Sequence, residues 1–172
     1  MKRPPPSLQA RALAWLAQRE HSRSELRSKL LRAAQRQAAA QPEAAPSAEE
    51  LLEQVERLLG TLQARGLLSD ERFVESRVRL RAASQGARRI QMELARHGLK
   101  ASAATLQELR DSELQRALLL WQRRFGRAAA DDKARARQAR FLAGRGFGGE
   151  VIHKVLAAAA ARPEAAADGE PG

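Results

Sequence analysis

The stretch that decides the fold is QGARRIQMELARHGL at residues 85–99, because a related stretch, RQARFLAGRGF, returns at residues 137–147. The offset is about 48 residues, and each copy is a basic helical pattern that ends at a glycine followed by one large apolar residue. The equivalent positions are Leu94 with Leu142, Gly98 with Gly146, and Leu99 with Phe147. A repeat of this length is typical of stacked supersecondary units rather than of a single enzyme pocket.

A third copy of the helical pattern lies nearer the N-terminus. The apolar pairs that mark the register are Leu26 with Leu30, Ile90 with Leu94, and Gln138 with Leu142, where a glutamine takes the first position. The step from the first copy to the second is longer than the next step, and residues 33–47, rich in Ala and Gln, account for the excess. This segment is either an insertion or a ragged extension of a helix, and we expect it to have little to bury.

Helical periodicity and caps indicate three helices in each unit and no convincing strand. The sequence therefore predicts an all-α protein of three tandem three-helix repeats. The expected parts are a disordered N-terminus at 1–7, repeats at 8–66, 67–109 and 110–162, and a flexible acidic tail at 163–172. Gly98 and Gly146 are predicted to end their helices in the left-handed conformation. Phe73, Trp121 and Phe125 are expected to fill the cores.

Composition narrows the functional classes. The chain of 172 residues has no cysteine, which removes disulfides, thiolate metal sites and cysteine nucleophiles. No run of about 18 apolar residues occurs, and the N-terminus lacks the apolar stretch of a signal peptide, so we expect a cytoplasmic protein with no membrane contact. The net charge of +11 favours nucleic acid or an acidic protein as the partner. A GC-rich genome would explain many arginines but not the excess of positive charge.

No catalytic or cofactor site is recognisable. The glycine-rich run at 144–149 lacks a preceding strand and the phosphate-loop lysine, so it is interpreted as a helix end and turn. The three histidines, His21, His97 and His153, have no ligand spacing, and we expect no bound metal. His97 is placed in the last turn of its helix, where its charge would suit the dipole. Glu93 is expected to form a solvated ion pair with the arginines of its own helix. The sequence indicates a protein that is not an enzyme and needs no cofactor.

The basic side chains group on helix faces. Lys133, Arg137 and Arg140 lie on one flank of the third signature helix, and Arg89 and Arg96 lie on a similar flank of the second. Stacked repeats would align these flanks into one stripe that matches phosphates or acidic grooves. The alternative is that each is only a solvated helix face. Further candidates in the first repeat are Arg23, Arg27 and Lys29. Aromatic residues do not interleave with the arginines, so base stacking is not supported.

Four segments in order resemble the RecX family, bacterial regulators of the RecA recombinase. They are REHSRSEL at 19–26, LLSDERF at 67–73, RRI at 88–90 with Glu93-Leu94, and Phe141-Leu142 with RGF at 145–147. The resemblance covers about residues 8–160. It implies three tandem three-helix repeats in an elongated, curved molecule. It also implies binding to RecA filaments on single-stranded DNA and inhibition of recombinase, ATPase and coprotease activities, which would modulate homologous recombination and the SOS response.

Charge and repeats alone define only the type of partner. A monomer with a basic flank could lie in the groove of a nucleoprotein filament and block strand access, closure around ATP, or addition at the growing end. The alternative is a stand-alone all-helical DNA- or RNA-binding protein of transcriptional or RNA-associated function. A third class is a structural scaffold, whose binding would depend little on salt.

Overall fold

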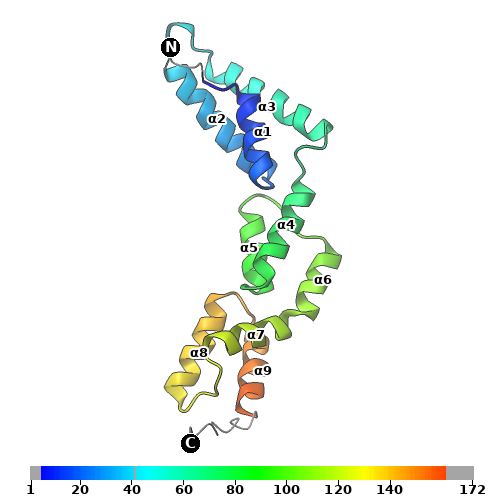
Figure 1. Ribbon diagram of the computed structural model, residues 1–172, viewed down its shortest axis with the longest axis vertical. Helices are drawn as coiled ribbons and strands as arrows, with labels where there is room; N and C mark the ends of the chain where they lie inside the picture. The colour runs from blue at the N-terminus through cyan, green and yellow to red at the C-terminus, as the bar shows by residue number, and fades with distance from the viewer. Residues whose placement is uncertain (1–4, 41, 162–172) are drawn as a thin grey trace, which may run out of the picture. The chain divides into compact units, whose positions relative to one another are not determined.

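The computed structural model describes residues 5–40 and 42–161 (Figure 1). Within these residues the chain forms helices and no strand, so the all-α prediction is confirmed. The elements in chain order are α1 (Leu8–Gln18), α2 (Arg23–Ala39), the short 3-10 helix η1 (Pro42–Ala44), α3 (Ala48–Ala64), α4 (Asp70–Ala82), α5 (Ala87–Ala95), α6 (Ala103–Asp111), α7 (Glu113–Arg124), α8 (Asp132–Gly144) and α9 (Gly149–Ala160).

The chain consists of two compact units. Unit 1 comprises the described residues up to Ser76 together with His97–Leu99. Unit 2 comprises residues 77–96 and the described residues from Lys100 onward. The division falls within α4, so the middle of the three sequence repeats contributes to both units.

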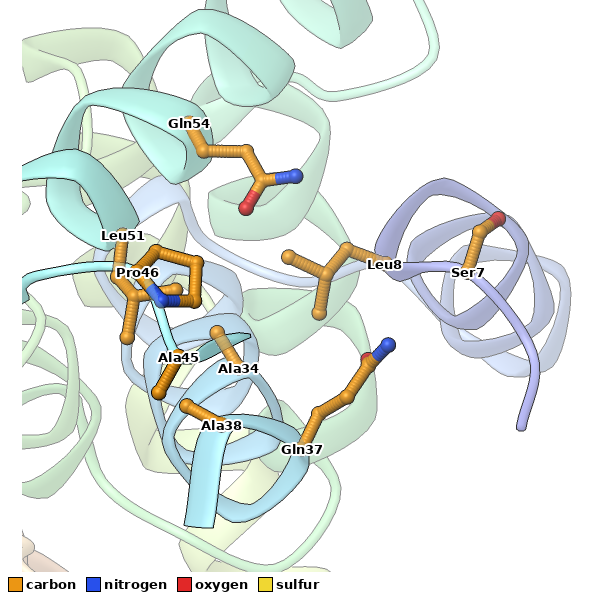
Figure 2. A pocket seen from close by; sticks show the side chains of 9 residues that line it. All are labelled: Ser7, Leu8, Ala34, Gln37, Ala38, Ala45, Pro46, Leu51 and Gln54. Carbon is orange, nitrogen blue, oxygen red and sulfur yellow. The ribbon is translucent and has the colours of Figure 1, made fainter. Parts of the chain in front are cut away.

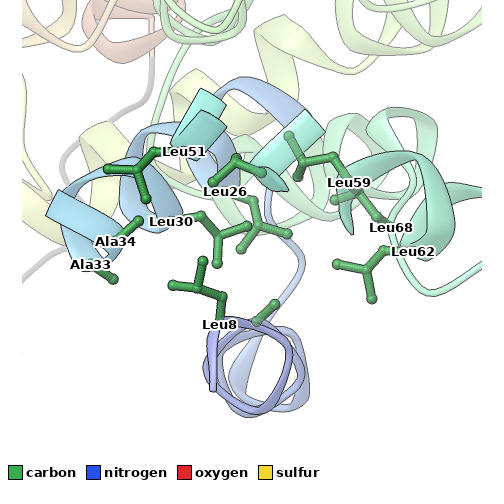
Figure 3. Packing of buried hydrophobic residues seen from close by; sticks show 11 residues of the cluster. Leu8, Leu26, Leu30, Ala33, Ala34, Leu51, Leu59, Leu62 and Leu68 are labelled. Atoms are coloured by element: carbon green, nitrogen blue, oxygen red, sulfur yellow. The ribbon is translucent and has the colours of Figure 1, made fainter. Parts of the chain in front are cut away.

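The core of unit 1 is a leucine-rich cluster between α1, α2 and α3 (Figure 3). Leu26 and Leu30 of α2 are fully buried, as are Val55 and Leu59 of α3. Spacings of four residues place each pair on one helical face. Burying one such leucine contributes about 1.5–3 kcal/mol, so this cluster supplies much of the stability of the unit.

The alanine-rich segment at 33–47 is, at its start, a helix extension. Residues 33–39 continue α2, and Ala33 and Ala34 are buried in the core of unit 1 (Figure 3). The expectation that this segment has little to bury is therefore wrong for its first residues. Alanine suits this position because its small side chain allows close packing without loss of helix propensity. Ser47 then caps α3 in a full capping box with Glu50.

The core of unit 2 contains Trp121 of α7, Leu142 of α8 and Val155 of α9, together with Phe147 from the turn between α8 and α9. It also contains Gln138, the polar residue of the helical register. The indole Nε1 of Trp121 donates a hydrogen bond of 2.8 Å to Gln138 Oε1, and both side chains are buried. A glutamine is accepted here because its polar atoms have partners, which removes the cost of burying them unpaired.

The predicted register is confirmed by burial. All three residue pairs are buried, namely Leu26 with Leu30, Ile90 with Leu94, and Gln138 with Leu142. Gly98 and Gly146 have φ angles of 73° and 86°, as predicted for left-handed helix ends. Phe73 and Trp121 are buried core residues, and Phe125 packs on the core in part.

The ends of the expected repeats need adjustment. Residues 1–4 of the expected disordered N-terminus and the expected tail at 163–172 lie outside the described residues. Ser7 was assigned to the disordered segment, but its side chain caps α1 by accepting the N–H of Ala10 at 3.2 Å. The second repeat also runs further than expected, because α6 ends at Asp111.

Candidate nucleic-acid interface

The N-terminus of α2 is held by the next repeat in what we term the first joint, formed by Ser22, Arg23, Ser24, Asp70 and His97. The backbone N–H of Arg23 donates to the Asp70 carboxylate at 2.7 Å. The Ser24 hydroxyl donates to the His97 carbonyl, and His97 Nδ1 lies 3.1 Å from Ser22 Oγ. An anionic acceptor at a helix N-terminus is favoured by the helix dipole.

The N-terminus of α5 is held in the same way by what we term the second joint, formed by Gly86, Ala87, Glu113, Arg145 and Gly146. The N–H of Ala87 donates to the Glu113 carboxylate at 2.8 Å, and the N–H of Gly86 donates to the Arg145 carbonyl at 2.9 Å. A Cβ atom on Gly86 would lie 2.3 Å from the Gly146 oxygen. The two backbones therefore touch, and only glycine leaves room for the contact.

Arg116 of α7 ties the α4–α5 connection to α6. Its guanidinium is half-buried and donates to the carbonyls of Ala82, Gln85 and Leu109 at 2.7–2.8 Å. Burial lowers the pKa of Arg116 from its ordinary value, but three carbonyl acceptors satisfy the charged group. This arginine therefore serves the fold of unit 2 rather than a binding surface.

The outward face of α8 carries the strongest candidate surface. Lys133, Arg137 and Arg140 are exposed, and none of their side chains makes a hydrogen bond or ion pair in the described part of the chain. They project from the side of α8 opposite the buried Gln138 and Leu142. We term these three side chains the α8 face. Their unneutralised charges can bind an extended anion without first breaking an internal ion pair.

The two predicted residues of α5 differ from each other. Arg89 is exposed, but its guanidinium donates to the carbonyl of Gly144 at the end of α8. Arg89 therefore neutralises the negative end of the α8 dipole. Arg96, at the C-cap of α5, is exposed, and its guanidinium has no hydrogen-bond or ion-pair partner among the described residues. Unit 2 thus contains all five of the first candidates, with Arg89 next to the C-terminal end of α8.

The candidates in α2 are engaged within unit 1. Arg23 and Arg27 both pair with Glu56 of α3, and Arg23 also donates to Gln63. These contacts link α2 to α3. They leave less free charge for an external partner than the α8 face does.

Lys29 packs on Trp15, with Nζ 4.4 Å from the ring centre, and it donates to His21 Nε2 at 3.0 Å. The other ring nitrogen of His21 donates to the Arg19 carbonyl at 3.0 Å, so the buried imidazole is neutral in this arrangement. Burial lowers the pKa of both His21 and Lys29. Lys29 therefore has a role inside unit 1.

Two sequence interpretations of charged groups are wrong. Glu93 pairs with Arg77 and Arg81 of α4 rather than with the arginines of α5. His97 lies beyond the C-cap of α5 and belongs to the first joint, where its ring meets Phe73 edge-on at 5.0 Å between centroids. Helical spacing could not reveal either contact, because both depend on which helix packs alongside.

A pocket of about 310 Å³ opens in unit 1 between the start of α1, the end of α2 and the start of α3 (Figure 2). Figure 2 shows Leu8, Ala34 and Leu51 facing one another, with Gln37 and Gln54 as the longest polar side chains. None of the described residues that line it is charged or titratable. The pocket therefore has no titratable side chain for acid–base chemistry, and the Ser7 hydroxyl at its edge accepts the N–H of Ala10 as a helix cap.

Over residues 5–40 and 42–161, no three His, Asp or Glu side chains are arranged to hold a metal ion. In the same residues, none of the helices has the length and apolar character needed to cross a membrane.

Comparison with known proteins defines the class. Residues 69–105 match the family description "RecX, second three-helix domain", and residues 111–156 match "RecX, third three-helix domain". The fold resembles the crystal structure of RecX from Lactobacillus salivarius, with a TM-score of 0.60 at 15% identity over 89% of this chain and 94% of that one. The chain is therefore a helical repeat protein built from three-helix domains.

Sequence relatives identify the family. The chain is 46% identical to the regulatory protein RecX of Leptothrix cholodnii over 156 residues, which cover 90% of each protein. It is 42% identical to the regulatory protein RecX of Ralstonia nicotianae over 158 residues, or 91% of this chain and 90% of the relative. The chain belongs to the RecX family of regulatory proteins.

Proposed function

We propose that this protein is a non-enzymatic regulator that binds RecA filaments on single-stranded DNA and inhibits their recombinase, ATPase and coprotease activities. It would thereby modulate homologous recombination and the SOS response. The observation that carries the proposal is the α8 face, three exposed cations without internal partners in a chain that belongs to a family of regulatory proteins. The partner is an extended anion, and the protein acts in the cytoplasm.

The chemistry of the α8 face suits phosphates. One cation lies at the start of α8 and two lie further along the same side, so the face follows a line rather than a point. Each phosphate neutralised by such a side chain releases counterions, which makes affinity fall steeply with salt. The lack of ion pairs matters because no carboxylate of the described chain must be displaced before DNA binds.

A triple substitution tests the proposal. Lys133→Gln, Arg137→Gln and Arg140→Gln together remove the charge of the α8 face and keep its helix-forming side chains. Binding is measured to RecA–DNA filaments assembled with a slowly hydrolysed ATP analogue, and to the same DNA without RecA, over a salt series. We expect weaker filament binding and a log–log salt slope that is smaller by about 2, since each contact with a single strand contributes about 0.7. DNA-dependent ATP hydrolysis by RecA should be slowed by the parent protein and much less by the variant.

The matched control removes three other exposed cations, with Arg57→Gln, Arg65→Gln and Lys100→Gln. It loses the same net charge and should bind filaments nearly as well as the parent. If both variants lose affinity equally, general charge and not the α8 face is responsible. Equal binding of the parent to bare DNA and to filaments would instead favour a stand-alone nucleic-acid binder.

A further inference from the structure

The three helices of the repeated register share a buried stripe but differ on the opposite side. The residue midway between the two buried positions points away from the core, because two residues turn the chain by about 200°. That residue is Ser28 in α2, Met92 in α5 and Arg140 in α8, and all three are exposed. The middle helix thus carries an apolar side chain where the last helix carries a cation.

Arginines surround Met92. Arg88 and Arg96 lie one turn before and one turn after it, and both are exposed on the same side of α5. Neither guanidinium has a hydrogen-bond or ion-pair partner among the described residues. The nearby acid of this helix, Glu93, is held by Arg77 and Arg81 of α4 and does not neutralise them. The outward side of α5 is therefore an apolar centre between two free guanidinium groups.

A second exposed apolar side chain lies on α4, the helix that the ion pairs of Glu93 join to α5. Leu80 of α4 is 68% exposed and Met92 is 54% exposed, which are the highest values for large apolar side chains in the described chain. Leu80 precedes Arg81, whose guanidinium donates to the Glu93 carboxylate at 3.1 Å. Glu93 follows Met92 directly, so this ion pair brings together the two backbone segments that carry the exposed apolar side chains. We term Leu80, Arg88, Met92 and Arg96 the α4–α5 face.

The composition of this face suits a protein rather than a nucleic acid. Met and Arg are enriched at protein interfaces, and a thioether adapts to an irregular apolar partner. Phosphates gain no favourable contact from an exposed methionine or leucine. Stacking on bases requires aromatic rings, which this face lacks. The α8 face shows the contrast, because it exposes cations and no large apolar side chain.

We infer that the α4–α5 face docks on a protein surface where carboxylates surround an apolar patch, while the α8 face takes phosphates. This inference rests on the proposed function, in which the acidic surface belongs to the recombinase subunits of the filament. The protein would then contact both components of the filament with different faces of one unit. Affinity for the filament over bare DNA would come from the α4–α5 face.

The test is the double variant Leu80→Gln with Met92→Gln, which keeps length and helix propensity while removing apolar surface. Binding is measured to RecA–DNA filaments and to the same DNA without RecA at two salt concentrations. We expect filament affinity to fall by about tenfold with an unchanged salt slope, and binding to bare DNA to stay the same. The single variant Met92→Leu, which keeps an apolar side chain at this position and the native Leu80, should bind filaments as well as the parent does. Arg140→Gln, the equivalent position on α8, should reduce the salt slope instead.

The outcomes separate the two proposals. If the parent protein does not prefer filaments to bare DNA, the proposed function fails. If the parent prefers filaments and the double variant binds them equally well, only the present inference is wrong. An equal loss of bare-DNA binding by the double variant would assign this face to nucleic acid. A dimer of the parent in sedimentation that the double variant abolishes would assign the face to a second copy of the chain. Either result overturns the inference.

Discussion

The two joints use the same first contact. In each, the first residue of a middle helix donates its backbone N–H to the carboxylate of the first residue of a helix in the next repeat. The donor and acceptor are Arg23 and Asp70 in the first joint, and Ala87 and Glu113 in the second, at 2.7 and 2.8 Å. One carboxylate thus satisfies an N–H that a helix start would otherwise leave without a partner.

The joints differ in how they close. The first uses side chains, because the hydroxyls of Ser22 and Ser24 meet the ring and carbonyl of His97. The second closes mainly through backbone, because Gly86 donates to the carbonyl of Arg145 and lies against Gly146. The one side chain beside this contact is Arg89, which donates to the Gly144 carbonyl. Side chains can adjust when a neighbour moves, but two backbones in contact cannot. The second joint should therefore be the less tolerant of substitution.

The largest expected effect comes from exchanging the N-cap residues. Gly86→Ser gives the second joint the cap of the first, but its Cβ would lie 2.3 Å from the Gly146 oxygen. The φ of Gly86 is −76°, which any residue adopts, so the loss would come from the contact alone. We expect the free energy of unfolding of unit 2 to fall by about 3 kcal/mol. Ser22→Gly should cost unit 1 only about 1 kcal/mol, the value of one cap and one hydrogen bond.

Urea unfolding can report the units separately. Trp121 is buried in unit 2 and Trp15 lies in unit 1, so a Trp15→Phe background isolates the signal of unit 2. Gly148→Ser is the control, since Gly148 is also an N-cap glycine of unit 2 and a Cβ on it meets no atom within 4 Å. A loss from Gly86→Ser no greater than that from Gly148→Ser would show that the second joint is as adaptable as the first.

A smaller loss of stability is expected from removing the carboxylate that both joints share. Asp70→Ala and Glu113→Ala each remove the acceptor of one backbone N–H and a favourable charge at a helix start. We expect each to cost about 1 kcal/mol, and the two losses to be similar. Hydrogen exchange of the amides of Arg23 and Ala87 should accelerate only in the matching variant. A large loss at one site alone would mean that the carboxylate is not the common element.

The comparison also separates what the sequence could predict from what it could not. The buried pairs and the glycine ends were predictable because they follow from helical spacing and from the few residues that accept a positive φ. The joints were not, because Arg23 and Asp70 are 47 residues apart and Ala87 and Glu113 are 26 apart. Which helix packs against which is a tertiary property.

The candidate site shows the same limit. The outward direction of Lys133, Arg137 and Arg140 followed from the register once Gln138 was placed inside. That Arg89 instead supports the end of α8, and that Arg23 and Arg27 share Glu56, required the structure. Helical spacing alone does not distinguish a cation that has an internal partner from one that has none. Gln138 is a polar residue at a position that is apolar in the other two copies, and its buried hydrogen bond with Trp121 explains why it is accepted there.

The smallest expected effect is a pH dependence confined to unit 1. His21 lies just before the first joint and is buried, and desolvation lowers its pKa from the usual 6.5 despite the Arg19 carbonyl. The unfolded chain then binds a proton more readily than the folded one, so stability rises with pH up to about 6.5 and declines as pH falls below it. Protonation would also remove the acceptor of Lys29 and place two positive charges together.

Urea midpoints at a series of pH values should show this decline in the Trp15 signal, with Trp121 replaced by Phe. The second joint contains no histidine, so the Trp121 signal should lack this contribution. His21→Gln should flatten the dependence of unit 1 even if its stability is lower at every pH, because the slope reports only the difference in bound protons. An unchanged slope in His21→Gln would assign the dependence to another group of unit 1.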